Sequence, residues 1–207
     1  MTSLNRIIFI TCICIYNSSV QATELTADTY ANQKTTKGVV LVAANWGRQW
    51  QCGEYENAQL VNLEFTNIKN NEKLALDTPT KLSANPEFIN YGYIVKPGTY
   101  AISAFSVKVA KSVTDVGYIK ADKDKLIADG VPNGGTFTVK AGEVSYIGHF
   151  FIDCYKEPIP WRYYPEGKEA FNSYVSSIKK QYEYLQDTDI TFNILDTSAF
   201  GTPYVLK

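Results

Sequence analysis

Residues 91–109, YGYIVKPGTYAISAFSVKV, indicate the fold class, because they contain two strand patterns joined by a turn. Residues 91, 93 and 95 carry large apolar side chains at alternate positions, the period of a β-strand with one buried face. Proline fixes one backbone dihedral and glycine permits the next, so residues 96–98 (KPG) predict a turn. A second strand pattern follows over residues 100–109, and the stretch therefore predicts a β-hairpin.

The chain on either side of this stretch is also rich in strand patterns. Residues 38–44 (GVVLVAA) form a continuous apolar run, typical of a central strand covered on both faces. Residues 61–66 alternate apolar and polar side chains, which predicts a half-buried strand. Residues 136–140 and 143–153 are strand patterns on either side of an Ala-Gly turn, and they predict a second hairpin.

One helix is expected near the C-terminus. Over residues 167–187 the apolar side chains trace one face of an amphipathic helix, and residues 189–195 are typical of a last strand. We therefore predict a mainly β protein, an antiparallel β-sandwich of the immunoglobulin or prealbumin type. It should carry one long C-terminal amphipathic helix and a final strand, all within a single domain over residues 38–207.

The two turns carry a resemblance to a known group of proteins. Residues 95–100 (VKPGTY) and 139–148 (VKAGEVSYIG) resemble turns of small prealbumin-like β-sandwich proteins of the bacterial envelope, several of which are uncharacterised. The resemblance covers about residues 38–153 and implies that fold and compartment, with no catalytic residues. This chain departs from that group because it lacks the lipid-attachment cysteine and has two internal cysteines and a long helix.

Composition and charge exclude one class of partner. The 207 residues include 20 basic and 21 acidic side chains, which gives a formal net charge of −1, and no dense basic cluster. Nucleic acid binding needs a positive surface, so we expect no nucleic acid partner. Aromatic residues make up 14% of the chain, an excess that needs an explanation.

The first 22 residues predict export. An apolar run over residues 7–16 follows Arg6 and is too short to span a bilayer. The small-residue pattern of residues 20–22 matches a signal peptide that is cut after Ala22. The cysteines within the run are not preceded by a small residue that closes it, so a lipid anchor is disfavoured. We expect a periplasmic or secreted mature chain with no transmembrane segment, beginning with a flexible polar leader over residues 23–37.

Two cysteines remain once this segment is removed, Cys52 and Cys154. An even pair in an exported chain predicts a disulfide, because export places the thiols in an oxidising compartment. The alternative is that Cys52 is a nucleophile whose thiolate is favoured by the nearby Arg48.

His149 is the only histidine, so a hydrolase or zinc site would have to use it. In the strand pattern of residues 143–153 it shares a face with Ser145 and Asp153, which lie too far along the strand to hydrogen-bond to it. We therefore predict no catalytic residues, no metal ligands and no cofactor, and we interpret His149 as a structural residue.

All three tryptophans lie in two segments, residues 45–55 (NWGRQWQCGEY) and 161–164 (WRYY), which the disulfide would bring to one end of the sandwich. Aromatic faces beside planar polar groups suit the recognition of sugars or peptides. The candidate ligand-binding residues are Trp46, Arg48, Trp50, Trp161 and Tyr163. The alternative is that Trp46 and Trp50 cap the core and Trp161 fills the junction between helix and sheet.

These patterns together predict an exported, non-enzymatic β-sandwich protein of the bacterial envelope. It would bind or scaffold an unidentified envelope protein or a glycan through its aromatic loop end. Two alternatives stay open. One is a secreted hydrolase with His149 as its base, and the other is an assembly subunit that interacts through the helix at residues 167–187.

Overall fold

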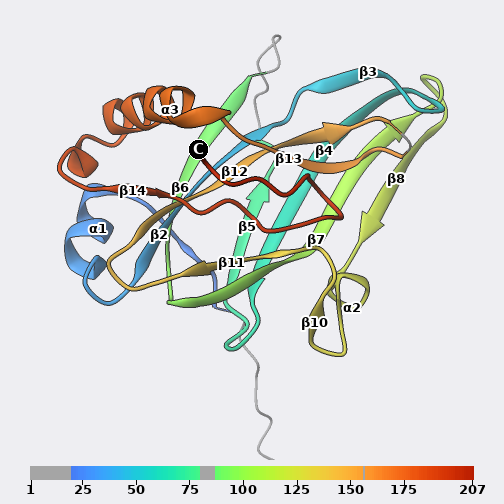
Figure 1. The fold of residues 1–207 in the computed structure, drawn as a ribbon. Coiled ribbons are helices and arrows are strands. Elements are labelled where there is room, and N and C mark those ends of the chain that lie inside the picture. The colour runs from blue at the N-terminus through green and yellow to red at the C-terminus, as the bar shows by residue number, and fades with distance from the viewer. Residues whose placement is uncertain (1–19, 80–86, 156) are drawn as a thin grey trace, which may run out of the picture.

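The computed structural model describes residues 20–79, 87–155 and 157–207, so the expected signal peptide lies almost entirely outside the described residues. The protein is mainly β and is built from two sheets, one mixed and one antiparallel. Helices α1 (Ala27–Gln33) and α3 (Gly167–Gln181) lie against the mixed sheet (Figure 1).

The two sheets have the following strand orders. The mixed sheet runs β1 (Thr23–Glu24), β6 (Phe88–Val95), β2 (Gly38–Asn45), β12 (Val144–Asp153) and β13 (Ile159–Tyr163), and β14 (Ile190–Phe192) also pairs with β12. The antiparallel sheet runs β11 (Thr136–Val139), β7 (Gly98–Ala110), β4 (Tyr55–Asn67) and β3 (Arg48–Cys52), with β5 (Lys73–Asp77) beside β4 and β8 (Val116–Ala121) beside β7. The short helix α2 (Lys123–Leu126) leads into a small pair, β9 (Ile127–Ala128) and β10 (Val131–Pro132).

A hydrophobic core lies between the sheets. All eight residues of β2 are buried, and the strand lies between β6 and β12, so the central position predicted from its apolar run is confirmed. Phe65 of β4 packs against Phe150 of β12 with ring centroids 5.5 Å apart. The inner faces of the two sheets thus interlock, as in other proteins built from packed sheets.

Neither predicted hairpin forms. β6 and β7 follow one another across the Lys96-Pro97 turn, but β6 pairs with β2 in one sheet and β7 pairs with β4 in the other. β11 and β12 are likewise consecutive strands that belong to different sheets. The turns are in the predicted places, but each carries the chain across the core. Turn residues specify a reversal of direction, whereas the choice of partner strand depends on which faces become buried.

Glu72 stabilises the first of these connections, the turn between β6 and β7. Glu72 is 1% exposed. Its carboxylate accepts hydrogen bonds from the Lys96 backbone N–H at 2.7 Å and from the Tyr100 hydroxyl at 2.5 Å. Burial raises the pKa of Tyr100, so this hydroxyl keeps its proton and can donate it. Charge-assisted hydrogen bonds of this kind are among the stronger ones in proteins.

The prediction of purely antiparallel sheets is wrong for one of the two. β12 runs parallel to β2, with Val144 opposite Val39, and also parallel to β14. Alternating apolar patterns report which side chains face the core, and they carry no information about strand direction.

Residues 23–37, the expected leader, contain a short strand and a helix. Its first two residues form β1 on the edge of β6, and Thr26 and Thr29 form a capping box at the start of α1. Tyr30 is buried, and its hydroxyl lies 2.9 Å from that of Thr188. Just before β1, the Ala22 N–H donates to the Lys73 carbonyl in β5 at 2.6 Å, so this segment bridges the edges of both sheets. Backbone hydrogen bonds and the buried side chains of Leu25 and Tyr30 hold this segment in place, and its polar composition did not indicate these contacts.

The predicted helix and final strand are both present, although the helix is shorter than residues 167–187. Tyr182 leaves the helical conformation with φ −119° and ψ 77°, and a 3-10 turn, η1 (Glu183–Leu185), follows. Ile178 of α3 packs with Leu41 and Ile94 in a second apolar cluster on the outer face of the mixed sheet. In the described part of the chain, no helix has the length and apolar character required to cross a membrane.

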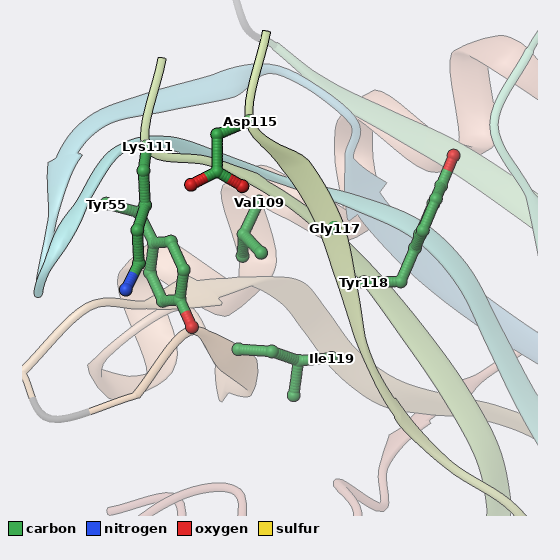
Figure 2. A pocket seen from close by; sticks show the side chains of 7 residues that line it. All are labelled: Tyr55, Val109, Lys111, Asp115, Gly117, Tyr118 and Ile119. Atoms are coloured by element: carbon green, nitrogen blue, oxygen red, sulfur yellow. The ribbon is translucent and has the colours of Figure 1, made fainter.

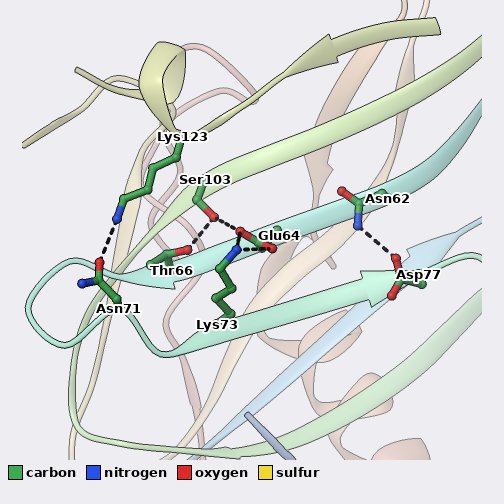
Figure 3. A network of polar contacts seen from close by, with 8 residues as sticks. All are labelled: Asn62, Glu64, Thr66, Asn71, Lys73, Asp77, Ser103 and Lys123. Atoms are coloured by element: carbon green, nitrogen blue, oxygen red, sulfur yellow. Dashed lines mark hydrogen bonds and ion pairs between the residues drawn. The ribbon is translucent and has the colours of Figure 1, made fainter. Parts of the chain in front are cut away.

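The outer face of the antiparallel sheet is polar. Lys73 lies 3.1 Å from Glu64, and the Ser103 hydroxyl donates to the same carboxylate at 2.9 Å (Figure 3). The Thr66 hydroxyl in turn donates to Ser103 at 2.7 Å. Ser103 and Thr66 are buried, and this network supplies the hydrogen bonds that buried hydroxyl groups need.

Candidate functional site

A bulge in β12 sets the position of the only histidine. The register between β12 and β2 shifts between Tyr146 and His149. Gly148 within the bulge has a φ of 126°, which residues with a side chain rarely adopt. The bulge changes the alternation of faces, so that Ile147 and Phe150 face the core while Tyr146 and His149 lie together on the outer face.

His149 is consequently paired with a tyrosine. The Tyr146 hydroxyl is hydrogen-bonded to Nδ1 of His149, and the Tyr174 ring of α3 lies 5.1 Å from the imidazole. Burial lowers the pKa of His149 to about 4, so the imidazole is neutral at pH 7 and can accept at Nδ1. Burial raises the pKa of Tyr146, so its hydroxyl remains the donor.

The predicted sharing of one face by Ser145 and His149 is wrong. Ser145 precedes the bulge and is completely buried, whereas His149 follows it on the outer side of the sheet. Within the described residues, the ring of His149 is hydrogen-bonded to Tyr146 alone. A hydrolase built on His149 would therefore need a nucleophile other than the serine on its own strand.

Beyond the bulge, five rings from three strands lie on the outer face of the mixed sheet, and we call them the aromatic surface. The aromatic surface consists of Phe88 of β6, His149 and Phe151 of β12, and Trp161 and Tyr163 of β13. The Phe88 ring centroid is 4.9 Å from that of His149 and 6.5 Å from that of Phe151. Trp161 and Tyr163 are the cross-strand partners of Phe151 and His149. Phe88 and Tyr163 are each 40% exposed, so this surface is open to solvent.

Trp46, one of the predicted ligand-binding residues, is in the core. It is 1% exposed, and its indole N–H donates to the Tyr91 hydroxyl at 2.7 Å. Its backbone carbonyl also accepts from the Gln59 side chain at 2.8 Å. A buried ring with its only donor satisfied has no face left for a ligand, so the core-capping interpretation holds for Trp46.

Arg48 and Trp50 are exposed, but on the other sheet. They lie two residues apart on β3, with the guanidinium 5.4 Å from the indole, and Trp50 is 56% exposed. The cross-strand partner of Trp50 is Asn57, whose neighbour Ala58 faces the core, so Trp50 points outward. Tyr118 of β8 is exposed on the same face, and Figure 2 shows it projecting to the opposite side of the strand from Ile119.

The five predicted ligand-binding residues therefore do not form one site. Trp161 and Tyr163 belong to the aromatic surface, Arg48 and Trp50 lie on the outer face of the antiparallel sheet, and Trp46 is buried between the sheets. The disulfide brings the two segments to one end, but the strands then present their side chains in opposite directions.

The predicted disulfide between Cys52 and Cys154 is confirmed, with its Cα atoms 4.7 Å apart. It joins the end of β3 to the residue after β12, so it ties the antiparallel sheet to the mixed sheet. The alternative of a free nucleophilic thiol at Cys52 is therefore wrong.

Sequence reasoning missed three contributors to this region, Phe88, Phe151 and Tyr146. One signal for the bulge was present, because a single glycine inside a strand pattern, here Gly148, often marks one. Phe88 gave no comparable signal, since it is the first residue of a strand whose position beside β12 depends on the whole sheet order.

Comparisons of the chain with family models, with curated proteins and with solved structures each find no match.

Proposed function

We propose that this is an exported, non-enzymatic binding protein of the bacterial envelope, periplasmic or released, and that its aromatic surface binds an uncharged polysaccharide chain. The observation that carries the proposal is the set of five rings from three strands, with Phe88 and Tyr163 at its edges 40% exposed. The signal pattern, the prealbumin-like resemblance and the disulfide support the export part, because disulfides persist in oxidising compartments.

The chemistry of the aromatic surface suits a sugar chain. Contiguous exposed apolar patches mark interaction sites, and aromatic rings offer flat apolar faces for stacking. β12 and β13 are neighbouring strands, about 4.8 Å apart, so their rings can contact adjacent parts of one sugar chain, and the Phe88 ring extends this row beyond His149. The five side chains carry no carboxylate or ammonium group, and His149 is neutral at pH 7. An uncharged chain therefore fits better than an ionic one.

One amide lies in the same region. Asn90 is opposite Ala43 of β2, which is itself opposite His149, so these residues form one row across the sheet. An amide can donate to and accept from sugar hydroxyls, which supplies the polar contacts that stacking alone lacks.

The proposal is tested by measuring binding of the purified chain to a panel of neutral and charged polysaccharides, peptidoglycan included. Tyr163→Ala should weaken binding by about tenfold or more, as expected for the loss of an exposed aromatic ring that stacks on the ligand. The matched control is Tyr118→Ala, because Tyr118 is also an exposed tyrosine but lies on the antiparallel sheet. That control should leave binding unchanged.

Two results would overturn the proposal. One is the absence of any bound polysaccharide, and the other is equal loss of binding in both variants. Capture of an envelope protein that depends on Tyr163 and is not competed by sugars would assign the aromatic surface to protein docking instead.

A further inference from the structure

The outer face of the antiparallel sheet has two halves that differ in charge. Near β5 the charged groups have partners, because Lys73 contacts Glu64 and the Asn62 amide donates to Asp77 (Figure 3). The other half consists of β3, β8 and the parts of β4 and β7 between them. Three cations project outward from these strands: Arg48, Lys108 and Lys120. None of them takes part in the two ion pairs found among the described residues.

The strand register brings these three cations together. Arg48 of β3 is opposite Gln59 of β4, and Gln59 is opposite Lys108 of β7. Lys108 is in turn opposite Tyr118 of β8, and Lys120 follows that tyrosine by two positions, so it points to the same side. Neighbouring strands are about 4.8 Å apart, so the three cations lie within a patch roughly 15 Å wide.

The carboxylates at this end of the sheet are directed elsewhere. Glu54 accepts a hydrogen bond from Lys111 at 2.9 Å, and this contact, together with the charge of Asp115, raises the pKa of Lys111. Figure 2 shows Asp115 and Lys111 on the opposite side of β8 from Tyr118. The chain as a whole has a formal net charge of −1, so the positive charge of this patch is a local feature.

Exposed apolar side chains accompany the cations. The indole of Trp50 lies 5.4 Å from the guanidinium of Arg48. Trp50 and Val116 are at the two edges of the row next to that of Arg48, and both are exposed. Val113, in the loop between β7 and β8, is 94% exposed. Tryptophan is enriched at the membrane–water interface, where its ring sits at the level of the lipid headgroups.

We propose that this part of the sheet docks on a membrane surface that contains anionic phospholipids. We call it the cationic face, and it consists of Arg48, Trp50, Lys108, Val116 and Lys120. Charge complementarity favours an anionic partner, because basic side chains close to such a surface are attracted to it. The exposed indole and valine favour a lipid surface over a soluble polyanion, since a soluble polyanion offers them no apolar environment. The cationic face is on the other sheet from the aromatic surface and does not depend on the proposed function.

The test measures how the protein partitions onto lipid vesicles. Every described helix and strand lies within residues 23–207, so the exported form without the signal segment is used. Co-sedimentation compares vesicles of phosphatidylcholine alone with vesicles that also contain about one third phosphatidylglycerol. The anionic vesicles should bind at least about tenfold more tightly, and high salt should remove this preference because it screens exposed charges.

The triple substitution Arg48→Gln, Lys108→Gln, Lys120→Gln should reduce the preference for anionic vesicles to about twofold or less. The matched control is Lys140→Gln, Lys168→Gln, Lys180→Gln, which removes the same charge from exposed positions in the turn after β11 and on α3. That control should keep most of the preference.

Trp50 gives a second readout. Brominated phosphatidylcholine in the anionic vesicles should quench its fluorescence, and Trp50→Phe should lose this quenching, because Trp46 is buried and Trp161 is on the other sheet. Equal binding to neutral and anionic vesicles would overturn the proposal, as would equal losses in the two triple variants. Binding to anionic vesicles without quenching of Trp50, together with equally tight binding to dextran sulfate, would also overturn it and assign the cationic face to an acidic polymer.

Discussion

The Tyr146 hydroxyl is hydrogen-bonded to Nδ1 of His149 within one strand, although the two residues are three positions apart. In a regular strand residues i and i+3 point to opposite faces, so this contact requires the bulge at Gly148. The same bulge separates Ser145 from His149 and turns His149 toward the aromatic surface. A single backbone irregularity therefore decides which neighbours the only histidine has.

Gly148→Ala should destabilise the protein by about 2 to 4 kcal/mol, because an added Cβ would sit 2.7 Å from Cγ of Arg162 and the backbone φ is 126°. The matched control is Gly130→Ala, where φ is 77° and no atom lies within 4 Å of the added Cβ. That control should cost about 1 kcal/mol from backbone strain alone. Urea unfolding of both variants measures the difference, and equal losses would show that the approach of Arg162 is unimportant.

Stability should fall as the pH is lowered below the ordinary His pKa of 6.5, because burial holds the pKa of His149 at about 4 in the folded state. Between these two values the unfolded chain binds a proton that the folded chain does not, so protons favour unfolding. The loss should be about 2 kcal/mol between about pH 7.5 and pH 5. Urea unfolding at several pH values measures it. His149→Gln should lack this slope, and an unchanged slope in that variant would assign the effect to other groups.

Removing the disulfide by the double substitution Cys52→Ala, Cys154→Ala should lower the free energy of unfolding by about 4 kcal/mol. The reason is that the bond closes a loop between residues 102 positions apart, which restricts the unfolded chain. Denaturant unfolding of the two chains gives the value. Peptide mapping without reductant provides the independent check, since separate peptides carrying Cys52 and Cys154 would contradict the bond.

Trp46→Phe should cost about 2 to 3 kcal/mol, since the ring is 1% exposed and its N–H donates to Tyr91. The matched substitution Trp50→Phe should change the stability by less than about 0.5 kcal/mol, because Trp50 is 56% exposed. Denaturation midpoints of the two variants provide the comparison. Similar losses would mean that Trp50 also packs against the core.

Strand positions could be predicted from the sequence better than strand partners. The apolar run at residues 38–44 indicated a central strand, and β2 is one. The turns at Lys96-Pro97 and Ala141-Gly142 were also predicted, but the strands on either side of each turn belong to different sheets. A turn signal is local, whereas pairing is decided by burial of faces far apart in the chain, here through contacts such as that of Glu72 with Tyr100.

The candidate site could be predicted only in part, for a related reason. Trp161 and Tyr163 were identified because tryptophan and tyrosine are conspicuous in the sequence. Their neighbours Phe88 and Phe151 come from other strands, and the sheet order that brings them together has no sequence pattern. Trp46 and Trp50 looked equivalent in the sequence, yet one is in the core and the other is in solvent.

The parallel pairing of β2 with β12 also has a consequence for synthesis of the chain. β2 can pair with β6 as soon as residue 95 has been made, but its other edge stays open until residues 144–150 exist. All eight residues of β2 are buried in the folded protein. An open strand edge of this kind can pair with strands of other chains. Contacts between residues so distant in sequence also form slowly. Completion of this sheet therefore comes late in synthesis, and a nascent chain that stops short of β12 should aggregate.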